Sequence, residues 1–300
     1  MKVLEHFLRS KVGLDLSSCE DAWRVTSQFA CVVDGATSAT GRTWTEQKWT
    51  SGKWAAEVLV RHVEAMSENG SDSTTASLPP SPRAVIHELS HALHTAYEQE
   101  GVLDIMQTHP AERPTASMVL YAPAWKQLVI VGDCQACLLS HQGDIVQRIQ
   151  PTKYNDQVMA QARSMYLQLA LAQGHVTQEQ LLKDVDDPGR QFIQPLRTQQ
   201  KIFQNNLAAP LPYRYWALDG FPIDEDSGME VHPVPPDTAQ IILASDGYPQ
   251  LFSTLHETET YLQELIHKDP LLIHHPHLST KGVRPGCESF DDRTYVRIEL

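Results

Sequence analysis

The chain has 300 residues, of which 41% are hydrophobic and 20% charged, and its formal net charge is −13. So acidic a surface repels nucleic acid and anionic membranes, which excludes both as partners and favours divalent cations or basic partners. There is no run of about 18 apolar residues to span a membrane, and the opening residues lack the apolar stretch of a signal peptide. The five cysteines are an odd number, and we expect a cytoplasmic protein.

The N-terminal part of the chain predicts one strand followed by two helices. Residues 23–33 are rich in β-formers and run into the turn signal Asp34-Gly35. Apolar side chains at helical spacing predict helices over residues 45–66 and 83–97. Between these helices, residues 67–82 are polar and punctuated by prolines, which predicts a surface loop within one domain.

The middle of the chain predicts several strands. Residues 116–122 and 127–134 read as a strand pair, and the four residues between them fit a hairpin. Residues 138–147 predict one further strand.

The remainder begins with a mainly helical insertion at about residues 154–206, with breaks at Gly174 and at residues 187–189. After it, the predicted elements are strands over 213–218, 239–244 and 294–300, and a helix over 257–267. Helices clustered between runs of strands favour an α+β fold over a doubly wound one. We expect a single domain over residues 1–300.

Three of the apolar strands end in an aspartate next to a glycine. These aspartates are Asp34, Asp133 and Asp246, and Asp291 comes just before the last strand. A carboxylate at the end of a buried strand costs free energy unless its charge is compensated. A divalent cation can compensate several carboxylates together, since hard cations take oxygen ligands. Each Asp-Gly pair alone is typical of an ordinary turn, so the metal hypothesis depends on the set.

Five motifs of the chain, in order, resemble those of the PPM (type 2C) family of metal-dependent serine/threonine protein phosphatases. They are the Glu-Asp pair within residues 18–22, the Asp-Gly strand end of 29–35, the hairpin of 114–136 with its Gly-Asp, the second Asp-Gly of 243–247, and the Ser-x-Asp-Asp-x-Thr of 289–294. The resemblance covers nearly the whole chain. It implies a four-layer α-β-β-α sandwich with two central antiparallel sheets.

The same resemblance implies a centre of two Mn²⁺ or Mg²⁺ ions at one end of the sandwich. Asp34 would bridge the ions, and Asp246 and Asp291 would complete the coordination of one of them. The full set of implied metal ligands is Glu20, Asp34, Gly35 through its carbonyl, Asp133 beside a third and weaker ion, Asp246 and Asp291. Two metals activate a bridging water and neutralise phosphoryl charge, so Asp34, Asp246 and Asp291 are the predicted catalytic residues. The implied substrate is a phosphoprotein or a small phosphoester.

The chain departs from the family pattern near the substrate phosphate. Residues 13–17 contain no arginine before the Glu-Asp motif, and residues 36–38 replace a histidine that serves many members as general acid. Arg42 is the predicted substitute contact for the phosphate. These departures leave a second hypothesis open, a catalytically silent module with the phosphatase fold that binds a partner or a metal.

Three further patterns have competing interpretations. His87 and His91, with Glu88 between them, match the helical zinc-protease motif, but no third ligand follows at the known spacing, so a zinc hydrolase is the less favoured hypothesis. Cys134 and Cys137 have CxxC spacing, but residues three apart on a strand point to opposite faces, which favours two buried thiols. Residues 188–206 carry arginines and a lysine that form either a substrate-reading face or a solvated helix face.

Overall fold

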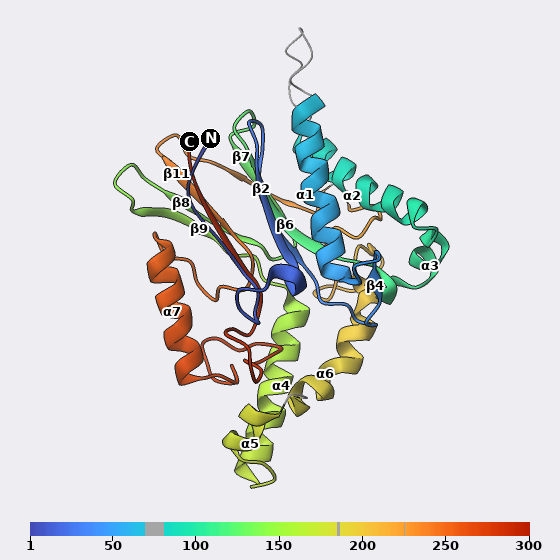
Figure 1. Cartoon of the computed structure of the whole chain (residues 1–300), viewed down its shortest axis with the longest axis vertical. Helices are drawn as coiled ribbons and strands as arrows, with labels where there is room; N and C mark the ends of the chain where they lie inside the picture. Colours follow the sequence, from blue (N-terminus) through green and yellow to red (C-terminus); the bar gives the residue numbers. More distant parts are fainter. Residues whose placement is uncertain (70–80, 185–186, 225) are drawn as a thin grey trace.

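The computed structural model describes residues 1–69, 81–184, 187–224 and 226–300. Over these ranges, two antiparallel sheets of five strands each form the centre of the molecule (Figure 1). One sheet has the order β1 (Lys2–Arg9), β12 (Arg293–Glu299), β11 (Gln240–Ala244), β8 (Gln135–Leu139) and β9 (Ile145–Ile149). The other has the order β10 (Glu230–Pro233), β7 (Gln127–Val131), β6 (Ala116–Ala122), β3 (Ala30–Gly35) and β2 (Asp21–Val25).

The remaining elements are helices and one short ribbon. The α-helices are α1 (Ser51–Asn69), α2 (Pro82–Gln99), α3 (Leu103–Thr108), α4 (Tyr154–Ala172), α5 (Gln178–Lys183), α6 (Pro188–Gln199) and α7 (Leu255–Lys268). Short 3₁₀ turns are η1 (Leu16–Ser18), η2 (Pro110–Glu112) and η3 (Gln200–Phe203). The ribbon consists of β4 (Thr43–Trp44) and β5 (Trp49–Thr50). None of the helices in the described ranges has the length and hydrophobicity that a membrane span requires.

Apolar residues on both faces of the strands explain why two sheets stack. Successive side chains of a strand point to opposite faces. In β3, Val32 therefore contributes to the core between the sheets, together with Leu243 and Val296 of the opposite sheet. Its neighbours Cys31 and Val33 point the other way, toward helices. A strand buried on both faces reads as a continuous apolar run, which is the pattern of residues 29–33.

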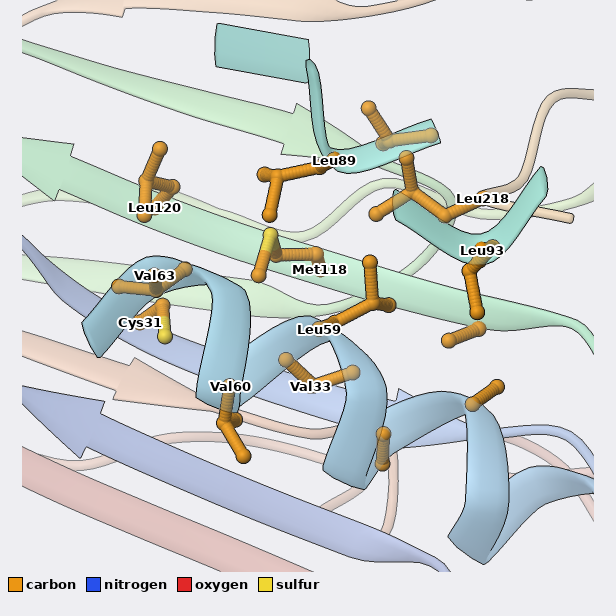
Figure 2. Close-up of a cluster of buried hydrophobic side chains, with 14 of the residues drawn as sticks. Cys31, Val33, Leu59, Val60, Val63, Leu89, Leu93, Met118, Leu120 and Leu218 are labelled. Carbon is orange, nitrogen blue, oxygen red and sulfur yellow. The ribbon is translucent and has the colours of Figure 1, made fainter. Parts of the chain in front are cut away.

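Helices cover the outer face of each sheet. Leu59 of α1 and Leu89 of α2 pack with Met118 of β6 in one cluster of buried side chains (Figure 2). On the other sheet, Leu262 of α7 packs with Ile242 of β11. The layers therefore run helix, sheet, sheet, helix, as the resemblance implied.

Most of the predicted elements are confirmed, with small shifts at their ends. The strand pair at residues 116–134 is β6 and β7, and the predicted strands at 239–244 and 294–300 are β11 and β12. The predicted helices at 83–97 and 257–267 are α2 and α7.

Two predicted single strands are in fact hairpins. Residues 23–33 contain a turn between β2 and β3, where the Thr26 hydroxyl accepts the backbone N–H groups of Gln28 and Phe29. Residues 138–147 contain a turn between β8 and β9, where the Ser140 hydroxyl accepts the N–H groups of Gln142 and Asp144. In both places a short side chain satisfies the backbone locally, and the chain reverses inside a run that reads as one strand.

Other predictions were wrong in extent or missed an element. The helix predicted from residue 45 begins at Ser51, because residues 43–50 form the β4–β5 ribbon. Residues 213–218, predicted as a strand, form a loop with isolated bridges from Tyr215 and Leu218. The strands β1 and β10 were not predicted. Of the predicted loop at 67–82, residues 70–80 lie outside the described residues, and residues up to Asn69 belong to α1.

The segment 154–206 is mainly helical. Its first helix, α4, ends at Ala172 near the predicted break at Gly174, and α6 begins at Pro188, so Pro188 and Gly189 of the second predicted break are helical. The segment comprises α4, α5, α6 and η3, which lie below one end of the sheets in Figure 1. Arg163 of α4 is fully buried and donates two hydrogen bonds to Asp187 Oδ2, at 3.0 and 2.6 Å. Asp187 also caps α6 by accepting the N–H groups of Gly189 and Arg190. This pairing fastens α6 against α4 beside the strand ends.

Candidate metal centre

Three strand ends bring Asp34, Asp133 and Asp246 together. Asp34 lies in β3, Asp133 follows β7, and Asp246 follows β11. Because β3 and β7 both run antiparallel to β6, they run in the same direction and finish at the same end of their sheet. Each of the three carboxylates offers an oxygen, and these oxygens lie within 4.8 Å of one another.

Glycines beside two of these aspartates permit close backbone approach. A Cβ atom at Gly35 would collide with the carbonyl oxygen of Gly52, at the start of α1. Gly132 has a φ of +88°, and a Cβ there would collide with the Ser117 hydroxyl. An L side chain at either position would therefore push the strand end away from its neighbour. These glycines place the adjacent carboxylates as well as turning the chain.

Asp34 and Asp246 are the two carboxylates of the cluster whose pKa values are raised. Burial raises the pKa of Asp34 well above its ordinary value, and the nearby charges of Asp21, Asp291 and Asp133 raise it further. Burial also raises the pKa of Asp246, together with the charges of Asp34 and Asp133. Since the Asp246 side chain meets the solvent of the cleft, we attribute its shift mainly to charge repulsion. A cation between the two carboxylates would relieve this repulsion.

Asp133 already has a cationic partner. Lys153 Nζ lies 2.8 Å from Asp133 Oδ1, and the Ser117 hydroxyl donates to the same oxygen at 2.6 Å. Burial alone would raise the pKa of Asp133, but Lys153 and Ser117 lower it overall. Lys153 also donates to the Ser117 hydroxyl at 3.2 Å, so the three side chains form one network.

Asp291 and Glu20 lie next to two more lysines. Asp291 forms ion pairs with Lys281 and, at 3.8 Å, with Lys11. Burial would raise the pKa of Asp291, but these two lysines lower it. Lys11 Nζ is also 3.5 Å from Glu20 Oε2 and 3.4 Å from Asp292 Oδ2. An ammonium group therefore stands among three carboxylates on this side of the centre.

Asp292 holds the backbone of Lys11 and Glu20 in place. The sequence motif did not indicate this role. Asp292 Oδ1 accepts the backbone N–H of Lys11 at 2.8 Å, and its Oδ2 accepts that of Glu20 at 2.9 Å. Asp292 is buried, so it ties the end of β1 and the residue before β2 to the start of β12.

The donor set fits a hard divalent cation at the strand ends. Asp34, Asp133 and Asp246 supply carboxylate oxygens at mutual distances that one ion can bridge. Glu20 is 3% exposed, and its Oε1 is buried without a hydrogen-bond partner in the described residues. A buried carboxylate oxygen without a donor is costly, and a cation or its bound water would satisfy it. The fit is less good around Asp291, where Lys11 and Lys281 already balance the charge.

Arg42 and the histidine motif lie apart from this group. Arg42 donates to Glu112 Oε2 at 2.8 Å, and it is not among the residues that line the cleft. His87 and His91 are exposed on α2, and Glu88 between them accepts a hydrogen bond from His62 Nε2 at 3.3 Å. In the described part of the chain, no third metal-binding side chain joins the two histidines. The structure therefore gives the zinc hypothesis no support.

The two CxxC cysteines are buried free thiols on opposite faces, as predicted. Cys134 packs in the core between the sheets, and Cys137 packs under α7.

A cleft of about 470 Å³ opens over the acidic cluster. Among the described residues that line it are five aspartates and five lysine or arginine side chains. Aspartates at the strand ends line it together with cations from residues 153–201 and from the segment before β12. Lys153 and Lys281 were missed by sequence reasoning, because neither lies in a recognisable motif.

Comparison with known proteins gives matches only among solved structures. No model of a known protein family matches the chain, and no curated protein sequence matches it. The serine/threonine phosphatase PstP/Ppp of Mycobacterium tuberculosis is 17% identical over 99% of each chain, with a TM-score of 0.45. Stp1 from Staphylococcus aureus is 12% identical over 100% of this chain and 96% of that one, with a TM-score of 0.49. The catalytic domain of PstP in complex with 2 manganese ions is 16% identical over 99% and 98%, with a TM-score of 0.44.

Because these TM-scores lie below 0.5, the likeness adds no weight to a function, which must depend on the side chains of this chain. The features that count are the five ordered motifs, the four layers and the carboxylates gathered at the strand ends. In these features the chain resembles the PPM-type serine/threonine phosphatases.

Proposed function

We propose that this chain is a metal-dependent phosphatase that hydrolyses phosphoserine, phosphothreonine or a related phosphomonoester by means of a metal-activated water. The observation that carries the proposal is the meeting of Asp34, Asp133 and Asp246 within 4.8 Å beneath an open cleft. Carboxylates brought this close repel one another unless a cation or a proton joins them. The cleft leaves room above them for a phosphorylated side chain.

In this proposal the carboxylates of Asp34 and Asp246 and the Gly35 carbonyl would hold Mn²⁺ or Mg²⁺, with Glu20, Asp133 and Asp291 near them. When bound, two such ions lower the pKa of a bridging water and neutralise phosphoryl charge during in-line attack. No protein nucleophile is needed, since the attacking oxygen comes from water. The strand ends contribute positioning, because each ligand stands on a packed strand or directly beside one.

Two further residues support this arrangement. Thr37 stands in the segment where many members of the family have a histidine, and its hydroxyl donates to Glu20 Oε2 at 2.7 Å. Thr37 therefore orients Glu20. Lys281 reaches the cleft from the segment before β12 and pairs with Asp291, so it holds that carboxylate at the cleft.

One observation favours the second hypothesis, a catalytically silent binding module. Lys153 neutralises Asp133, and Lys281 neutralises Asp291, without any metal. If these pairs persist in solution, the centre binds metal weakly and turns over slowly, and the cleft serves for binding alone. Metal affinity and turnover therefore separate the two hypotheses.

The test is turnover of p-nitrophenyl phosphate by purified protein with Mn²⁺, Mg²⁺, Zn²⁺ or EDTA. We expect activity with Mn²⁺ or Mg²⁺, none in EDTA, and none for Asp34→Asn under any condition. Binding of Mn²⁺ without turnover would favour the silent module. Activity that requires Zn²⁺ and survives in Asp34→Asn would contradict both readings.

A further inference from the structure

A row of polar side chains on α6 and η3 lines the cleft over the acidic cluster. Arg190, Gln194, Arg197 and Lys201 follow one another at intervals of four, three and four residues, and all four line the cleft. This is the spacing of residues on one face of a helix. Ile193, which borders this row, is fully buried, so the row lies beside the packed side of α6. The helix therefore turns a defined basic and amide face toward the cleft.

The two arginines of this row differ from the other cations of the cleft. Lys153 and Lys281 are paired with Asp133 and Asp291. Lys201 donates to Thr115 Oγ1 at 2.8 Å and to Gln204 at 2.9 Å.

Arg190 and Arg197, by contrast, have no carboxylate within ion-pair distance in the described residues, although both are half-buried. Burial lowers the pKa of Arg190, and the positive charges of Arg197 and Arg284 lower it further. The acids that act on Arg190, Asp291 and Asp187, are both held by other cations. Asp156 of α4, which lines the same cleft, attracts Arg197 from beyond ion-pair distance. Guanidinium groups that repel one another at a cleft have unused capacity for anions.

The length of the row indicates more than one anion. Arg197 lies seven positions after Arg190, which corresponds to about 10.5 Å along the axis of a regular helix. Two arginine side chains at this spacing can converge on one phosphate, but the whole row from Arg190 to Lys201 covers eleven positions, about 16 Å, which is longer than one phosphate. An extended peptide advances about 3.3 Å per residue and presents every second side chain to one face, so anionic side chains two or four residues apart, about 7 or 13 Å, can face the row together. The row therefore fits a strand of peptide better than a small phosphoester.

We propose that the row Arg190–Gln194–Arg197–Lys201 binds acidic residues that flank the phosphorylated residue of a peptide substrate. The identity of the central residue as a phosphoresidue rests on the proposed function, while the row itself is independent of it. The chain as a whole carries −13, so an acidic peptide is repelled elsewhere and attracted here. The row is thus a specificity determinant that selects acidic sequences.

The test uses two fluorescein-labelled peptides that carry the phosphonate analogue of phosphoserine, whose C–P bond is not hydrolysed. The three residues on each side of the analogue are Glu in one peptide and Gln in the other. Fluorescence anisotropy with Mn²⁺ present gives the two dissociation constants. We expect the wild-type protein to bind the Glu peptide at least about tenfold more tightly than the Gln peptide, with a preference that weakens as salt is added.

Variants assign the preference to the row. The double variant Arg190→Gln/Arg197→Gln should bind both peptides equally, and Arg190→Lys/Arg197→Lys should keep a preference because the charges remain. Lys183→Gln is the matched control, since Lys183 lies in the same insertion, is 75% exposed and pairs with Glu179 away from the cleft. Thermal melts show that each variant folds.

Two outcomes would overturn the inference: equal binding of both peptides by the wild-type protein, or an undiminished preference in the glutamine double variant. Neither depends on turnover. Absence of p-nitrophenyl phosphate hydrolysis with an intact Glu-peptide preference would contradict the proposed function alone. Hydrolysis without the preference would contradict this inference alone.

Discussion

Lys153 Nζ lies 2.8 Å from Asp133 Oδ1, so a lysine directly before the helical insertion already supplies a positive charge beside one strand-end carboxylate. Lys153 is the residue that directly precedes α4. The pair links the insertion electrostatically to the acidic cluster. It also sets up a competition, because a metal ion at this position must displace or tolerate an ammonium group.

Replacing Lys153 tests that competition. In Lys153→Met the repulsion between the ammonium and an incoming cation is gone, and we expect Mn²⁺ to bind about tenfold more tightly. Isothermal titration calorimetry measures the affinity. Lys183→Met, a change of the same kind at an exposed site, should leave it unaltered. Weaker Mn²⁺ binding in Lys153→Met would show that Lys153 organises the site.

Metal binding should stabilise the folded protein. Because the carboxylates are brought together only in the native state, Mn²⁺ or Mg²⁺ shifts the unfolding equilibrium toward it. We expect the midpoint of thermal unfolding to rise with Mn²⁺ concentration and to fall back in EDTA. Identical melts across a wide range of Mn²⁺ would remove the metal centre from consideration.

Asparagine substitutions should separate repelled carboxylates from paired ones. In EDTA, Asp34→Asn and Asp246→Asn should melt above the wild type by about 2–4 °C, because they relieve charge repulsion. Asp291→Asn should melt below it, because Lys281 and Lys11 lose their partner. With Mn²⁺, all three variants should lose the metal-linked gain. Three variants that melt below the wild type in EDTA and bind Mn²⁺ normally would show that the carboxylates are purely structural.

The metal-free protein should become more stable as the pH falls toward 5. Asp34 and Asp246 have raised pKa values in the folded chain, above the ordinary 3.8, so the native state binds more protons than the unfolded state. Stability therefore decreases as pH rises from 3.8 through the folded pKa values. Asp133 and Asp291 have lowered pKa values, so the stability that their ionised forms contribute is lost only as the pH falls below 3.8.

Melts in EDTA between about pH 7.5 and pH 5 measure this effect, and the double variant Asp34→Asn/Asp246→Asn is the control that lacks both groups. The wild type should gain more on acidification than the double variant. Parallel pH profiles of the two proteins would show that these carboxylates titrate normally.

Changing the histidine motif should leave phosphatase activity intact. His87 is exposed on α2, a helix that covers the outer face of a sheet. His87→Ala should therefore change stability by no more than about 0.5 kcal/mol and turnover of p-nitrophenyl phosphate by less than about twofold. A folded His87→Ala protein that does not hydrolyse p-nitrophenyl phosphate would contradict this prediction and show that α2 contributes to the active site.

The sequence by itself determined the local features of this protein. Runs such as residues 29–33 specify strands buried on both faces, and the amphipathic spacing of residues 83–97 specifies α2. The strand-end aspartates Asp34 and Asp246 could be named in advance, because a carboxylate after an apolar run is visible in the chain itself. These features depend on neighbours within a few residues, where period and turn chemistry act.

Only the tertiary structure decided which charges meet. Lys153 lies 20 residues from Asp133 in sequence and Lys11 lies 280 residues from Asp291, and no local pattern announces either pair. The same holds for Arg190 and Arg197, whose helix could equally have faced solvent. Their position over the cleft follows from the buried Arg163–Asp187 pair, which fastens α6 to α4. Contacts between distant segments depend on how whole elements pack, because the energy of an ion pair is set by burial and distance in the folded chain.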